Sequence, residues 1–294
     1  MSVARRVIIV AVGALVIVLG LGLVSIVRSD GVPAPDPSPA PQVEQTLLLQ
    51  VLDGDGYAVA NSVIGVEPPQ DEPLTTILVI PGSLLVPGGD DSVTLGLTPQ
   101  SPDTLAGLVA LEQVLGLRVD AGLTLDRLAF AGLVDGVNGV WVELERPVLL
   151  PEIGDDGRLR VLGPGWVKMD GVAAADYAVL RVPGESEAAR MERFSAILRS
   201  VIAALPPTDD QLRQLVTSLG SLAQSTVPTE DLVPFLLSVR TDVEFGDVRI
   251  DTLPVEVIRG GARPASVAAP QAQSLVRVLF PDARVVPDDA GMTG

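Results

Sequence analysis

The sequence LVDGVNGV at residues 133–140 opens the most informative part of the chain, which ends near residue 198. Three further motifs follow it in order: MDG at residues 169–171, AVLR at residues 178–181 and RMERF at residues 190–194. The first motif has the asparagine and glycines of a turn, and it leads into the alternating apolar residues of a strand. The last motif opens a long amphipathic helix. Strands and helices therefore interleave in this region.

The same interleaving extends over the whole region from residue 46 onward. Strands are expected at residues 46–52, 63–66, 74–80, 117–123, 140–144 and 248–257. Helices are expected at residues 105–115, 125–134, 171–180, 185–205, 209–222, 229–239 and 270–279. Because helices and strands alternate without a repeat period, we predict an α/β fold: a three-layer sandwich with a mixed β-sheet flanked by helices.

The N-terminal residues predict a membrane anchor. Residues 7–27 contain no charge and can cross a hydrocarbon core of roughly 30 Å. Arg5 and Arg6 predict that residues 1–6 stay in the cytoplasm. A cleaved signal peptide is the alternative, but its apolar region is typically only about 7–15 residues long.

The remaining boundaries follow from composition. Residues 28–45 contain five prolines at alternating positions, which favour an extended spacer. We expect residues 46–281 to form one extracytoplasmic domain and residues 282–294 to form a polar tail. The chain is thus expected to be a single-pass protein of the cell membrane.

Composition excludes several kinds of chemistry. The chain has no cysteine and no histidine, which removes thiolate and histidine catalysis and most zinc sites. It carries 37 acidic against 20 basic residues, a net charge of −17 that disfavours nucleic acid. Aromatic residues make up only 3% of the chain, so we expect an aliphatic core and no aromatic platform for sugars or bases.

The order of the motifs resembles the LytR–CpsA–Psr family over about residues 47–280. These membrane-anchored enzymes move cell-wall glycopolymers from a polyprenyl-pyrophosphate carrier onto peptidoglycan. The resemblance implies an aliphatic pocket for the polyprenyl tail between the sheet and the helices. It also implies two aspartates that hold Mg²⁺ and several arginines that neutralise the phosphates. Metal and guanidinium groups would stabilise the charge that develops on the leaving group.

Matching the family's metal site to this chain gives one carboxylate and one amide. The first metal-binding aspartate falls on Asp53 and the second on Asn61. An amide oxygen coordinates a hard cation without bringing charge, so we expect Mg²⁺ binding to be weakened.

The family's phosphate site is matched in part. Arg181 and Arg190 would bind the lipid pyrophosphate and act in catalysis, and Arg193 and Glu187 would complete the binding set. Other family residues are replaced. Val59, Gly82 and Pro183 stand where the family has arginines, and Phe194 stands in place of a glutamine.

Each matched residue also has a purely structural interpretation. Asp53 could be a turn residue, and Arg181 could stabilise the end of a helix. Glu187, Arg190 and Arg193 have the spacing of a solvated ion-pair face on a helix. The residues alone leave both interpretations open.

The residues support three hypotheses for function. The one we prefer is a family homologue with weakened or lost catalysis, which binds polyprenyl-linked lipid or serves as a regulatory or scaffolding protein. The second is an active, Mg²⁺-dependent glycopolymer phosphotransferase with a rearranged site. The third is a structural or receptor-like ectodomain without a lipid ligand. The expected partners are polyprenyl-linked lipid or cell-wall glycopolymer, and the protein partner is unknown.

Overall fold

The computed structural model describes residues 43–286, apart from residues 69–73, 90, 102, 104, 152–158, 181–184, 246 and 259–264. The predicted anchor, residues 28–42 of the predicted spacer, Arg181 and Pro183 lie outside the described residues. Gln45, a residue of the predicted spacer, is the first residue of strand β1 (Gln45–Leu52). Among the helices that are described, none combines the length and the apolar character needed to cross a bilayer. The compact unit that contains these helices and the strands begins at Val43.

A six-stranded mixed sheet forms the centre of this unit, in the order β11-β6-β1-β2-β3-β12. Its strands are β1 (Gln45–Leu52), β2 (Ala58–Val66), β3 (Leu74–Pro81), β6 (Ala121–Leu125), β11 (Ala223–Ser225) and β12 (Asp247–Thr252). The pairs β1–β6 and β3–β12 are parallel, and the other neighbouring pairs are antiparallel. All nine residues of β2 are buried, because helices cover both faces of the sheet.

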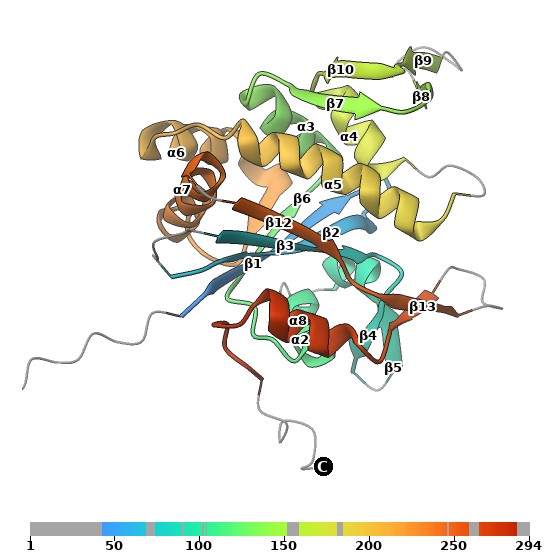
Figure 1. Ribbon diagram of the computed structural model, residues 1–294, viewed down its shortest axis with the longest axis vertical. Helices are drawn as coiled ribbons and strands as arrows, with labels where there is room; N and C mark the ends of the chain where they lie inside the picture. Colours follow the sequence, from blue (N-terminus) through green and yellow to red (C-terminus); the bar gives the residue numbers. More distant parts are fainter. Residues whose placement is uncertain are drawn as a thin grey trace, which may run out of the picture. The chain divides into compact units, whose positions relative to one another are not determined.

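The helices form two layers, one on each face of the sheet (Figure 1). They are η1 (Leu95–Gln100), α2 (Ala106–Leu115), α3 (Arg127–Gly136), α4 (Gly171–Val179), α5 (Glu187–Ala203), α6 (Asp209–Ser218), η2 (Gly220–Leu222), α7 (Thr229–Phe245) and α8 (Ala272–Leu279). One apolar cluster joins the sheet to α3, α4, α5 and α7, and a second joins it to α2 and α8. The predicted α/β sandwich with a mixed sheet flanked by helices is confirmed.

Four two-stranded sheets lie around this centre, and the sequence did not lead us to expect most of their strands. They pair β4 (Leu85–Gly88) with β5 (Asp91–Thr94), β7 (Val140–Leu144) with β10 (Gly165–Met169), β8 (Val148–Pro151) with β9 (Leu159–Leu162), and β13 (Val255–Ile258) with β14 (Ala265–Ala268). Figure 1 shows β7 and β10 on the outer side of α3, α4 and α5.

The motifs at residues 133–140 and 169–171 meet where α3 packs on α4. Asp135, at the end of α3, accepts a hydrogen bond from the backbone N–H of Gly171 at 2.7 Å. A Cβ atom at Gly171 would lie 2.0 Å from the Ala131 carbonyl oxygen, so only glycine allows this approach. Asp170 caps α4 through the N–H of Ala173, and that hydrogen bond lowers the pKa of Asp170. These motifs are therefore fold determinants.

Candidate functional site

Asp53 organises the turn between β1 and β2. Its Oδ1 accepts hydrogen bonds from the backbone N–H groups of Asp55 and Tyr57, both at 3.0 Å. Its own N–H donates to the Tyr57 carbonyl at 2.9 Å. This is an Asx-type turn, in which a short acidic side chain substitutes for backbone partners. The structural interpretation of Asp53 thus accounts for its contacts.

Asn61 is buried in the middle of β2, with no exposed surface. Its Oδ1 accepts a hydrogen bond from Gln50 Nε2 at 3.0 Å, and its Nδ2 donates to the Ala58 carbonyl at 3.1 Å. Gln50 Oε1 in turn accepts from the Thr124 hydroxyl at 3.5 Å. A neutral chain of side chains across β2, β1 and β6 therefore stands at the position that the resemblance matched to a metal-binding aspartate.

Gly82, which stands in place of a family arginine, is packed against Tyr57. The Tyr57 hydroxyl donates to the Gly82 carbonyl at 2.6 Å. A Cβ atom at Gly82 would lie 2.3 Å from the Ala58 carbonyl oxygen and 3.1 Å from Cε1 of Tyr57. A side chain at position 82 therefore requires the backbone at Ala58, the first residue of β2, to move.

Glu187 and Arg190 form an ion pair in the first turn of α5, and each side chain is 16% exposed. Glu187 Oε1 and Arg190 Nε are buried and have no hydrogen-bond partner in the protein. Buried polar atoms of this kind are costly unless a ligand or water satisfies them. Among the predicted site residues that the structure describes, this pair is the one with buried polar atoms that lack a hydrogen-bond partner in the protein.

Arg193, one turn further along α5, is fully engaged. It donates to both carboxylate oxygens of Glu185, at 3.0 and 2.7 Å, and to the carbonyls of Tyr177 and Leu180. Its guanidinium carbon also lies 5.2 Å from the centre of the Tyr177 ring. These contacts hold the end of α4 against α5, an arrangement that local sequence patterns do not predict.

The predicted residues do not converge on one point. Asn61 lies opposite Gln50 and Ile80 in the strand ladder and shares their face of the sheet, toward α2. Glu187, Arg190 and Arg193 belong to α5, which packs on the other face. Asp53 lies in the turn that ends β1. Arg181 is outside the described residues, so its predicted role stays a prediction.

The donors do not fit the predicted Mg²⁺ site. The Asn61 amide oxygen is enclosed and already bonded to Gln50, and Asp53 Oδ1 accepts two backbone N–H groups. Within the residues the structure describes, no three acidic side chains come close enough together to hold a metal ion. A hard divalent cation needs several oxygen ligands, and these donors do not supply them.

A cleft of about 580 Å³ lies between the β7–β8 connection, the end of α4 and α5. Its charged lining comprises four glutamates and two arginines: Glu143, Glu145, Glu185, Glu192, Arg146 and Arg193. Arg193 is already paired with Glu185. Among the described residues of this cleft carboxylates outnumber arginines, a balance that disfavours a pyrophosphate.

The LytR_cpsA_psr family model matches residues 107–275, more than half of the chain. The chain belongs to the LytR–CpsA–Psr family. The match includes all the motifs that carried the resemblance and begins after Asp53, Asn61 and Gly82. No curated protein matches the sequence.

Several solved structures share the fold. Bacillus subtilis TagV has a TM-score of 0.68 at 15% identity, covering 84% of this chain and 100% of that chain. TagT bound to LI-WTA has a TM-score of 0.67 at 18% identity, covering 87% and 97%; TagT is a B. subtilis protein. Protein gbs0355 of Streptococcus agalactiae has a TM-score of 0.67 at 15% identity, covering 82% and 89%. Identities this low establish the fold alone.

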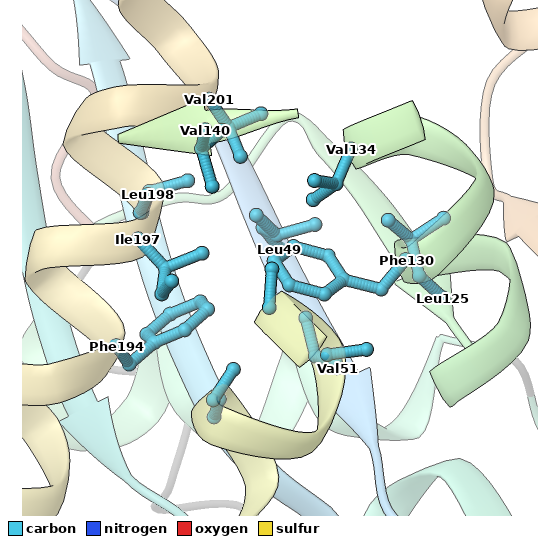
Figure 2. Close-up of a cluster of buried hydrophobic side chains, with 14 of the residues drawn as sticks. Leu49, Val51, Leu125, Phe130, Val134, Val140, Phe194, Ile197, Leu198 and Val201 are labelled. Carbon is cyan, nitrogen blue, oxygen red and sulfur yellow. The ribbon is translucent and has the colours of Figure 1, made fainter. Parts of the chain in front are cut away.

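Buried apolar side chains lie in the interior where the LytR–CpsA–Psr resemblance implied a lipid pocket. Figure 2 shows Phe130 from α3 and Phe194 from α5 pointing toward each other over Leu49 and Val51 of β1. The two ring centroids are 6.4 Å apart, and none of these four side chains is more than 4% exposed. Phe194, which the resemblance matches to a family glutamine, is thus a buried residue of this core.

Proposed function

We propose that this LytR–CpsA–Psr protein is a non-catalytic homologue that acts as a scaffold in the cell envelope and holds cell-wall glycopolymer without transferring it. The single observation that carries this proposal is the Gln50–Asn61 pair. It replaces a charged metal site with two neutral amides that satisfy each other in a buried position.

Two further features support loss of transfer. Tyr57 and the Ala58 carbonyl occupy the space around Gly82, which leaves no room there for a phosphate-binding side chain. Phe130 and Phe194 fill the layer between the sheet and the helices. Without metal, with fewer arginines and with a filled interior, the developing charge of a leaving pyrophosphate would have little stabilisation.

The proposed place of action is the outer surface of the cell membrane. The uncharged segment at residues 7–27, the basic pair before it and the proline-rich spacer support a single membrane anchor with the α/β domain outside. A glycopolymer held there would remain close to the membrane on which its carrier lies.

The test is a transfer assay with the full chain in detergent. Polyprenyl-pyrophosphate-linked glycopolymer and peptidoglycan fragments are supplied with and without Mg²⁺, and both retained and transferred glycopolymer are measured. We expect retention, with transfer no faster than in a protein-free control. Transfer that requires the protein and Mg²⁺ would overturn the proposal.

The second candidate, an active transferase with a rearranged site, is favoured by one observation. Arg190 Nε and Glu187 Oε1 are buried without partners at the start of α5, where a phosphate oxygen or a hydroxyl could satisfy them. If transfer is found, Arg190→Ala should abolish it. Arg199→Ala is the matched control, because Arg199 lies on the same helix and is exposed.

A further inference from the structure

Both tryptophans of the chain lie on one exposed face of the β7–β10 sheet. In the antiparallel register, Trp141 is opposite Lys168 and Trp166 is opposite Glu143. Residues directly opposite each other point to the same side of a sheet, so these four side chains share a face and the indoles are diagonal neighbours. Trp141 is 54% exposed and Trp166 is 66% exposed. The expectation that the chain has no aromatic platform is therefore wrong, because strand pairing brings together two tryptophans that are distant in the sequence.

The other face of the same two strands is apolar and packed on the domain. Val140, Val142, Leu144 and Met169 are each at most 3% exposed. The hydroxyl of Ser200 on α5 donates to the Trp141 carbonyl at 2.7 Å, which ties the strand to the helix. The strands that carry the two indoles are therefore anchored to the domain. The indoles are exposed because the opposite, apolar face of these strands is buried.

The chemistry of this face combines flat apolar rings with hydrogen-bonding groups of opposite charge. A pyranose ring has the complementary pattern, with C–H groups on its flat faces and hydroxyls around its edge. The negative face of an indole attracts the weakly positive C–H hydrogens, and Lys168 and Glu143 can bond to the hydroxyls. A purely apolar partner would leave both charged groups buried without partners.

We propose that the Trp141–Trp166 face is a docking site for a neutral polysaccharide strand. This inference rests on the proposed function for the setting in which the protein meets that strand. It adds a ligand class and a surface that are separate from the residues matched to the pyrophosphate site.

Charge distinguishes this occupant from a phosphate-rich glycopolymer. Glu143 on the Trp141–Trp166 face also lines the cleft where, among the described residues, four glutamates stand beside Arg146 and Arg193. A polyanion lying across this region would meet more carboxylates than arginines, and the chain has a net charge of −17. A neutral polysaccharide carries no charge to be repelled, so the same surface accepts it.

The experiment uses the full chain in detergent and β-1,4-linked N-acetylglucosamine oligomers as the probe. Because Trp141 and Trp166 are the only tryptophans, intrinsic fluorescence reports on this face alone. We expect a saturable change in emission, with a dissociation constant that calorimetry reproduces. Trp141→Ala and Trp166→Ala should each weaken binding about 3- to 10-fold, and the double variant should weaken it further.

Phe245→Ala is the matched control, since Phe245 is 73% exposed and lies on α7 outside this face. It should leave the affinity unchanged. No saturable binding, or binding that persists in the double variant, would overturn the proposal. So would tighter binding of a glycerol-phosphate polymer than of the neutral oligomer, or emission that changes only with anionic phospholipid vesicles. Glycopolymer transfer is measured in a separate assay, so failure of the proposed function is distinguished from failure of this docking site.

Discussion

The face of the central sheet toward α3 and α5 carries mainly apolar side chains, with Ser62 and Thr75 as buried polar exceptions. The face toward α2 carries Gln50, Asn61 and Thr124 side by side. Leu49 and Val51 point to the first face, and Gln50, between them, points to the second. Phe194, which the resemblance matches to a family glutamine, is part of the core on the first face. Asn61, which it matches to an aspartate, is half of a neutral pair on the second face.

The comparison shows two ways in which a binding site can be lost without loss of the fold. A pocket can be filled by larger side chains. A buried charged group can be replaced by neutral groups that form hydrogen bonds with each other. Reversing either replacement by mutation should change the free energy of unfolding. Substitutions on the two faces should therefore differ in effect, and the largest effect is expected on the apolar face.

Phe194→Ala should destabilise the domain by about 3–5 kcal/mol, because it removes a buried ring from the contact with Phe130. Chemical denaturation measures the change. Phe245→Ala, at an exposed position on α7, should cost no more than about 0.5 kcal/mol. A loss below about 1 kcal/mol for Phe194→Ala would mean that this layer is open and would restore the lipid-pocket hypothesis.

Arg193→Ala should cost about 3 kcal/mol, because it leaves Glu185 buried without its partner and uncaps the end of α4. Arg213→Ala is the control, since Arg213 and Asp209 form an exposed ion pair worth at most about 1 kcal/mol. Thermal unfolding of the two variants compares them directly. Equal effects would show that Arg193 does not hold α4 against α5.

Asn61→Asp should destabilise the domain by about 1–3 kcal/mol at neutral pH, because it removes the amide N–H that donates to the Ala58 carbonyl. The exposed Asn138→Asp is the matched control at the only other asparagine. Restoring the family's carboxylate is expected to bring no transfer activity while Gly82 is unchanged. A gain of Mg²⁺-dependent transfer would contradict the loss of the site.

Glu44 makes the stability of the domain depend on pH. It lies over Gly65 on the polar face, is 1% exposed, and neither carboxylate oxygen has a hydrogen-bond partner. Burial, with the nearby charge of Glu67, raises the pKa of Glu44 from 4.5 to about 8. Between about pH 5 and 8 the Glu44 carboxyl is therefore protonated in the folded protein but ionised in the unfolded chain. Because the folded state binds the extra proton, the free energy of unfolding should fall as pH rises from about 5 to 9.

Glu44→Gln should flatten this pH dependence and raise the free energy of unfolding by about 1 kcal/mol or more at pH 8. The control Glu256→Gln, at an exposed position, should change neither. Burial also raises the pKa of Asp176 and of Asp242, so a shallower slope of the same sign should remain. Unfolding titrations between about pH 5 and 9 measure both slopes. An unchanged slope in Glu44→Gln would show that Glu44 is solvated in the folded state.

Sequence patterns predicted the main elements closely, because apolar periodicity reports which face of an element is buried. The predicted helix at residues 125–134 begins at Arg127, because Asp126 caps it by accepting the Ala129 N–H at 2.6 Å. The predicted strand at residues 248–257 is two strands, β12 and β13, separated at Leu253 and Pro254. The strands β8 and β9 were missed, since pairs so short have little pattern of their own.

The candidate site was only partly predictable. The sequence alone determined the α/β class, the family to which the chain belongs and the neutral residue types at Asn61 and Gly82, because these depend on residue type and order. Only the tertiary structure decided that Gln50 completes Asn61, that Arg193 is engaged by Glu185, and that Trp141 and Trp166 share a face. Those outcomes depend on strand register and helix packing, which bring together residues that are distant in the chain and leave no mark on local periodicity.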